Sequence, residues 1–153
     1  AATFRLPDVS RVRLMLSPSG AVAIEIRPLP PHPPEPVAVA LVPRTLAADD
    51  FRLAHKTSDR AFYDAPRTQA GTFEILFEDE AGFLTEGSFT HLFVEQGGVL
   101  LTPPLARGLL PGILRERLIE EGRAREADLS AADLAHGFLI GNAARGLIRA
   151  KLG

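Results

Sequence analysis

An internal lysine is the first residue in this sequence that could carry out covalent chemistry. The chain has 153 residues and contains fifteen arginines but only two lysines, Lys56 and Lys151. A lysine amine can lose its proton and form a Schiff base with a carbonyl compound, whereas an arginine guanidinium stays protonated. Lys56 is therefore a candidate nucleophile. The alternative is an exposed lysine at the start of a helix.

A second candidate site lies where a helix is predicted to begin, at Pro111 and Gly112. The predicted helix ends at Gly122, and its apolar face consists of Ile113, Leu114, Leu118 and Ile119. A helix N-terminus has free backbone N–H groups and a positive dipole end, which suit a phosphate group. A Pro-Gly pair also begins many ordinary core helices, so both interpretations stay open on this segment alone.

Composition and motifs exclude several other chemistries. The sequence has no cysteine and therefore no disulfide, thiolate nucleophile or sulfur-ligated metal, which is compatible with a reducing cytoplasm. Its four histidines lack the helical spacing of metal ligands, and no G-x-S-x-G elbow or G-x-x-x-x-G-K-[ST] loop is present. A net charge of −2 offers no basic surface for nucleic acid. No stretch approaches the roughly 20 apolar residues that span a membrane.

The elements that must position these residues are predicted to be mostly strands. Residues 11–16 and 21–27 alternate apolar and polar side chains around a Ser-Pro-Ser-Gly turn, a pattern typical of a β-hairpin. Residues 28–36 contain six prolines and are predicted to form an exposed connector. Further strands are predicted over residues 37–42, 72–77, 89–95, 98–102, 137–141 and 146–150.

Two further short helices are predicted. Around residues 57–64, Thr57 or Ser58 can cap a short helix that runs to the region of Pro66. Ser130 can cap the other, with Asp133 as the acidic residue of its first turn. Few helices among many strands predict a mixed α/β domain dominated by antiparallel strands.

Five motifs occur in an order and at a spacing that resemble one enzyme family. They are HKT at 55–57, LTEGS at 84–88, TPP at 102–104, GLLPGILR at 108–115 and GNAARG at 141–146. Together they resemble class IV aminotransferase-like enzymes of fold type IV, which use pyridoxal 5′-phosphate (PLP). The closest likeness is to 4-amino-4-deoxychorismate lyases, particularly those fused behind an aminodeoxychorismate synthase component. The resemblance implies that residues 1–153 form the large C-terminal cofactor-binding domain of that fold, with no metal.

The resemblance gives Lys56 and Glu86 the two central roles. Lys56 would carry the cofactor as a Schiff base and then act as a base. Glu86, thirty residues later in LTEGS, would pair with the pyridine nitrogen of PLP and keep it protonated. His55 is expected to be structural, since neighbouring residues on a strand point to opposite faces.

The remaining cofactor contacts are also implied by the resemblance. The backbone amides of Ile113 and Leu114 would hold the cofactor phosphate, and Leu110 would pack on its ring. Asn142 lies where the family has a small polar residue that reaches the phosphate. Arg145 could hold a substrate carboxylate or could be an ordinary surface arginine.

Three further residues, Arg60, Tyr63 and His91, lie near these motifs. Arg60 and Tyr63 could approach the phenolic oxygen of the cofactor or brace Glu86, and a packing role is an equal alternative. His91 departs from the family, which usually has asparagine five residues after the pyridine-pairing glutamate. A histidine can replace some of the hydrogen bonding of an asparagine there.

The resemblance predicts a cytoplasmic PLP-dependent lyase that releases pyruvate from a small molecule, aminodeoxychorismate, and yields 4-aminobenzoate for folate. One alternative is a transaminase for branched-chain or D-amino acids. The other is a fragment that is inactive without the N-terminal domain of roughly a hundred residues found in this family. That domain supplies part of the substrate pocket, and residues 1–55 resemble instead the first strands of the large domain. A homodimer is expected for the intact enzyme.

Overall fold

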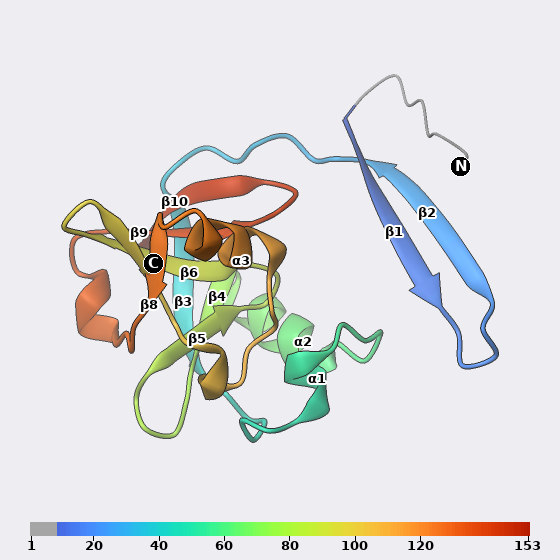
Figure 1. The fold of residues 1–153 in the computed structure, drawn as a ribbon, viewed down its shortest axis with the longest axis horizontal. Helices are drawn as coiled ribbons and strands as arrows, with labels where there is room; N and C mark the ends of the chain where they lie inside the picture. The colour runs from blue at the N-terminus through green and yellow to red at the C-terminus, as the bar shows by residue number, and fades with distance from the viewer. Residues whose placement is uncertain (1–8) are drawn as a thin grey trace. The chain divides into compact units, whose positions relative to one another are not determined.

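The computed structural model describes residues 9–153, and the chain divides after Pro33 into two compact units. In the first unit, strands β1 (Ser10–Leu16) and β2 (Val22–Pro28) pair antiparallel along their whole length (Figure 1). The predicted hairpin is therefore confirmed, and it forms a two-stranded sheet of its own. The predicted connector follows it, with no helix or strand from residue 29 to 36. A single domain over residues 1–153 stays a prediction.

The second unit is built on an eight-stranded sheet with the order β5-β4-β3-β10-β9-β6-β7-β8. Its strands are β3 (Val37–Pro43), β4 (Glu74–Glu78), β5 (Leu84–Gly87), β6 (His91–Gln96), β7 (Val99–Thr102), β8 (Ala124–Glu126), β9 (Phe138–Asn142) and β10 (Gly146–Leu152). β5 also pairs with β6, so the strands from β5 to β6 close into a ring that β7 and β8 extend. Most pairings among the described residues are antiparallel, as predicted. The short strands β5 and β8 were not predicted.

Three α-helices accompany this sheet: α1 (Phe51–Ala54), α2 (Ala61–Ala70) and α3 (Ile113–Glu120). Two 3₁₀ turns, Leu105–Arg107 and Ala131–Leu134, complete the helical elements of the described chain. The Ser130 cap is confirmed, with reciprocal hydrogen bonds to Asp133.

The prediction for the helix near residue 57 was wrong at both ends. α2 begins at Ala61 without a side-chain cap, and it continues through Pro66 to end at Gly71 in the left-handed conformation. The hydroxyl of Thr57 instead donates to the carbonyl of Asp59, which stabilises a turn before the helix. The missed helix α1 is only one turn long, and the side chain of Asp50 caps it.

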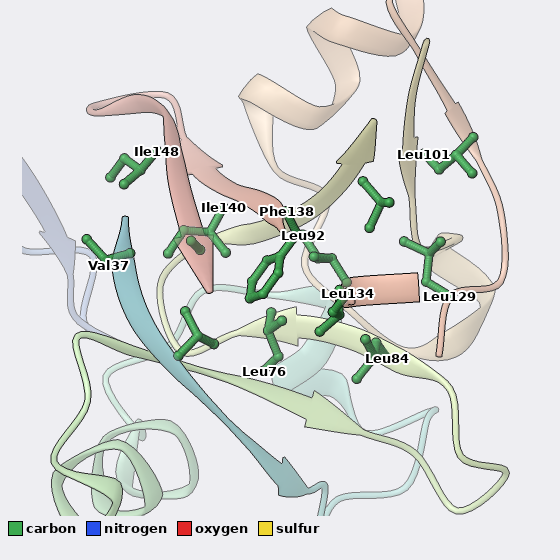
Figure 2. Close-up of a cluster of buried hydrophobic side chains, with 13 residues drawn as sticks. Val37, Leu76, Leu84, Leu92, Leu101, Leu129, Leu134, Phe138, Ile140 and Ile148 are labelled. Carbon is green, nitrogen blue, oxygen red and sulfur yellow. The ribbon is translucent and has the colours of Figure 1, made fainter. Parts of the chain in front are cut away.

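The main hydrophobic core lies on one face of the sheet, and it follows the two-residue period of the strands. Leu92 and Val94 of β6 point into it, together with Ile140 of β9 and Ile148 of β10 (Figure 2). Phe93, between Leu92 and Val94, belongs instead to a second cluster with Leu118 of α3. The strands therefore have two buried faces, one of which is covered by helices.

The helices cover the opposite face in two groups. Leu53 of α1 and Tyr63 of α2 pack with Ile75 and Phe77 of β4. α3 packs through Leu118, with Leu114 and Ile119 partly buried, against residues of β6, β9 and β10. Among residues 9–153, no helix is both long and apolar enough to cross a membrane.

The predicted apolar face of α3 was wrong for one residue, Ile113. Ile113 is 69% exposed, whereas Arg115 is 2% exposed. The guanidinium of Arg115 can be buried because it donates to the carbonyl of Pro103 and forms an ion pair with Glu126 of β8. The face of α3 that packs against the protein therefore includes Arg115, which is paired with Glu126.

Candidate active site

Lys56 follows the short helix α1 and is exposed to solvent. The backbone N–H of His55 donates to the carbonyl of Phe51, which ends the helix just before the lysine. The charge of Lys56 reaches His91 of β6: burial, then the charges of Arg115 and Lys56, lower the pKa of His91 to about 4. The amine of Lys56 is thus accessible to solvent, and its charge acts on His91.

Glu86 is the buried acid of the site. It lies on β5 with 3% of its surface exposed, and it accepts hydrogen bonds from the hydroxyl of Tyr63 and from the backbone N–H of Leu110. Burial raises the pKa of Glu86 to about 7, although both hydrogen bonds and the charge of Arg60 oppose this rise. Burial and the neighbouring carboxylate also raise the pKa of Tyr63. The Tyr63 hydroxyl therefore stays protonated and donates a hydrogen bond to Glu86.

Arg60 supports this acid from α2 without touching it. Its Nη2 donates to the carbonyl of Ser88 at 2.7 Å, and its guanidinium lies 5.0 Å from the centre of the Tyr63 ring. The cation is thus fixed between Asp64, 3.5 Å away, and the loop after Glu86. Among the roles considered from sequence, the structure shows that Tyr63 braces Glu86 and also packs in the core. Arg60 reaches Glu86 only through Tyr63 and the Ser88 carbonyl, and an approach of either residue to the phenolic oxygen of the cofactor stays a prediction.

A second buried acid, Glu74, holds the loop that follows Glu86. The side chain of Glu74 is completely buried on β4, and it accepts five hydrogen bonds. They come from the backbone N–H groups of Ile75, Ser88 and Phe89 and from the hydroxyls of Ser88 and Thr90, at 2.6–3.0 Å. Burial raises the pKa of Glu74, and the hydrogen bonds oppose that rise. Sequence analysis missed this residue, because a lone glutamate in a strand gives no signal of its own.

The glycine of the LTEGS motif is required by this acid. A Cβ atom on Gly87 would lie 2.8 Å from Oε2 of Glu74 and 2.7 Å from the hydroxyl oxygen of Thr90. Both atoms belong to the hydrogen-bond network around Glu74, so neither can move without breaking that network. The motif therefore encodes space for the Glu74 carboxylate.

The start of α3 provides the predicted helix N-terminus. Gly112 is its N-cap and makes no side-chain capping bond, so the first N–H groups, from Ile113 onward, have no partner within the helix. Leu110 is half-buried and Leu114 partly buried, while Ile113 is exposed. The motif therefore predicts a role for the backbone N–H groups of this turn rather than for its side chains, and their contact with the phosphate stays a prediction.

Asn142 lies at the end of β9 and links its turn to the same loop. Its Oδ1 accepts from the backbone N–H groups of Ala144 and Arg145, both at 3.0 Å, and its Nδ2 donates to the carbonyl of Phe89 at 3.1 Å. One hydrogen of Nδ2 is not used by these bonds. The contact of Asn142 with the phosphate stays a prediction, and so does a substrate-binding role for Arg145, which is half-buried at this turn.

We expect Glu74→Gln to destabilise the fold by about 1–3 kcal/mol, since an amide nitrogen would face donors that now meet a carboxylate oxygen. The measurement is urea unfolding at neutral pH. Glu80→Gln, a matched change at an exposed site, should alter the free energy of unfolding by less than about 0.5 kcal/mol. Equal effects of the two substitutions would show that the Glu74 network adds no stability.

The raised pKa of Glu86 predicts a pH dependence of stability. Because its pKa is about 7 in the folded chain and 4.5 ordinarily, its contribution is complete below the lower value and is lost as pH rises through the higher one. Between about pH 5 and about pH 8, wild type should lose up to roughly 3 kcal/mol relative to Glu86→Gln. Urea unfolding of both proteins without cofactor tests this, and a constant difference would refute the raised pKa.

The comparisons with known proteins show which family the chain resembles. The family model described as "Amino-transferase class IV" matches residues 4–152. A Schizosaccharomyces pombe protein, provisionally named an aminodeoxychorismate lyase, is 29% identical over 129 residues, which are 79% of this chain and 55% of the relative. The aminodeoxychorismate lyase of Saccharomyces cerevisiae is 34% identical over 91 residues, 55% of this chain and 24% of the relative. The chain thus spans about half or less of the length of these curated relatives.

Solved structures give the same result. A Mesorhizobium loti protein, provisionally described as an amino-acid aminotransferase, is 38% identical and superposes with a TM-score of 0.86 over 94% of this chain and 73% of its own. The fold type IV architecture expected from the sequence is thereby confirmed. On the match over nearly its whole length, this chain belongs to the amino-transferase class IV family, whose members are PLP-dependent enzymes.

Proposed function

We propose that this chain is the cofactor-binding part of a PLP-dependent 4-amino-4-deoxychorismate lyase, which releases pyruvate and leaves 4-aminobenzoate. The observation that carries the proposal is that a chain of the class IV family has both an accessible amine, Lys56, and a buried carboxylate, Glu86. The two relatives named as aminodeoxychorismate lyases favour this reaction within the family.

The residues present fit PLP chemically. Lys56 offers a primary amine for the aldehyde, and the first turn of α3 offers backbone N–H groups for the phosphate. Glu86 is buried and held by two donors, Tyr63 and Leu110. A protonated pyridine nitrogen brought against this carboxylate would favour its ionised form and lower its raised pKa. Leu110 is half-buried beside Glu86, in a position to cover a ring.

The chain's own residues would divide the work of an elimination. When bound, PLP supplies an electron sink for the electron pair that proton removal leaves on the substrate. Lys56 would take that proton from the carbon that bears the substrate's amino group. Glu86, kept in place by Tyr63, would hold the proton on the pyridine nitrogen. Loss of the enolpyruvyl ether as pyruvate then balances the reaction without a second substrate, and formation of an aromatic ring favours it.

A transaminase is the second candidate function, since the 38% identical Mesorhizobium loti protein is described as an aminotransferase. In that reaction Lys56 would return the proton to the cofactor. We further propose that the family's N-terminal domain completes the substrate pocket and that the intact enzyme is a cytoplasmic homodimer. If so, residues 1–153 alone bind the cofactor but turn over the substrate more slowly than the complete enzyme does.

The first test is covalent labelling. We expect PLP followed by borohydride to modify the peptide that contains Lys56 and to leave the exposed Lys151 unmodified, since only Lys56 belongs to the site. Peptide mapping by mass spectrometry measures the label. Lys56→Ala should lose it and Lys151→Ala should keep it. Equal labelling of both lysines would mean that the amine reacts without a site, and the proposal would be wrong.

The second test separates the two reactions. The complete protein, supplied with PLP and aminodeoxychorismate but no keto acid, should release pyruvate and 4-aminobenzoate in equal amounts. Lys56→Ala should lower the rate by about a hundredfold or more, since it removes the base. A coupled lactate dehydrogenase assay measures the pyruvate. Activity that appears only when a keto acid is added would identify a transaminase instead.

A further inference from the structure

The opening turn of α3 rests on a histidine side chain. His91, on β6, is 7% exposed, and its imidazole packs against Gly112, the N-cap of α3. A Cβ atom added to Gly112 would lie 1.9 Å from Nε2 of His91. The φ of Gly112 is −84°, which any residue can adopt, so its backbone conformation does not require glycine. The imidazole occupies the space that a side chain at position 112 would need.

A second close contact holds the same turn beside the first. A Cβ atom on Gly141 of β9 would lie 2.9 Å from Cδ2 of Leu114 and 2.6 Å from the carbonyl oxygen of Gly146. Gly141 is the direct partner of His91 in the pairing of β6 with β9. Two neighbouring positions of the sheet therefore receive the first turn of α3: an imidazole meets Gly112, and a glycine meets Leu114.

The buried imidazole has an energetic cost that this packing helps to offset. Nδ1 of His91 is buried and has no hydrogen-bond partner among the described residues. The side chain also faces two cations, Arg115 and Lys56, which disfavour its protonation. What the imidazole gains in return is its close contact with the turn at Gly112.

We propose that His91 is a positioning residue, which packs on Gly112, fixes the first turn of α3 on the sheet and so places the backbone N–H groups of Ile113 and Leu114 for the cofactor phosphate. This inference rests on the proposed function, because it assigns that turn to the phosphate. His91 does not need to touch the cofactor for this role. It replaces the shorter asparagine that the family resemblance predicts at this position, and it fills the volume against Gly112.

The experiment compares two ligands across a set of variants. PLP and pyridoxal differ in the phosphate, and the internal hemiacetal that pyridoxal also forms in water is the same for every variant. The change in the ratio of their dissociation constants between variants therefore isolates the phosphate contacts. We expect Gly112→Ala to reduce the preference for PLP by about tenfold or more, since its Cβ would displace the turn from His91. His91→Ala in the Gly112→Ala background should restore most of the preference by vacating that space. The exposed His136→Ala is the matched control and should change nothing in either background.

The preference for PLP in these variants decides the question. An unchanged preference in Gly112→Ala would overturn the inference, and so would the failure of both His91→Ala and the milder His91→Asn to raise the preference in that background. If Gly112→Ala does not fold by circular dichroism, recovery of folding and of PLP preference in the double variant supports the contact, and no recovery overturns it. A wild-type protein that binds PLP no more tightly than pyridoxal would refute the proposed function itself, whereas a wild-type preference without coupling refutes only the role of His91.

Discussion

The interaction on which the rest of the site depends is the buried carboxylate of Glu74 with its five hydrogen bonds. A carboxylate this far from water is stable only if its lone pairs are satisfied, so the loop at Ser88–Thr90 has to fold around it. The carbonyls of Ser88 and Phe89 in that loop accept hydrogen bonds from Arg60 and from Asn142, respectively. One buried charge thereby connects β4, α2 and β9 through a loop that has no regular structure.

The closure of the ring between β5 and β6 gives that loop its importance. Glu86 of β5 pairs with His91 of β6, so the acid of the candidate site and the residue that packs on Gly112 are direct neighbours. The loop held by Glu74 is the connection between them. A displacement of that loop would therefore move both Glu86, the proposed partner of the pyridine nitrogen, and His91, the proposed support of the phosphate turn. A carboxylate outside the proposed reacting centre could in this way affect the contacts proposed for both ends of the cofactor.

Sequence analysis found the residues whose signals are local and missed those whose roles are set by packing. Lys56 and Glu86 stand inside recognisable motifs, and the glycines of α3 mark its ends, so these positions follow from short segments. Glu74 and Arg115 are buried because partners distant in sequence satisfy them, and no local pattern reports such partners. The exposure of Ile113 has the same origin. Hydrophobic spacing alone places Ile113 on the buried face of α3, whereas the residue buried on that face is the paired Arg115.

The buried acids and the exposed lysine of the candidate site lie in different electrostatic environments. Glu86 is kept in a dry environment where a cation is strongly favoured, and Tyr63 and Leu110 fix its direction. Lys56 lies at the surface, where its amine can exchange protons and meet a ligand. His91, which pairs with Glu86 in the sheet, is neutral because burial and two cations lower its pKa, so it adds volume without adding charge beside the proposed phosphate turn. A neutral ring leaves the proposed phosphate contacts to the backbone N–H groups of the helix N-terminus, and the amine of Lys56 stays assigned to the aldehyde.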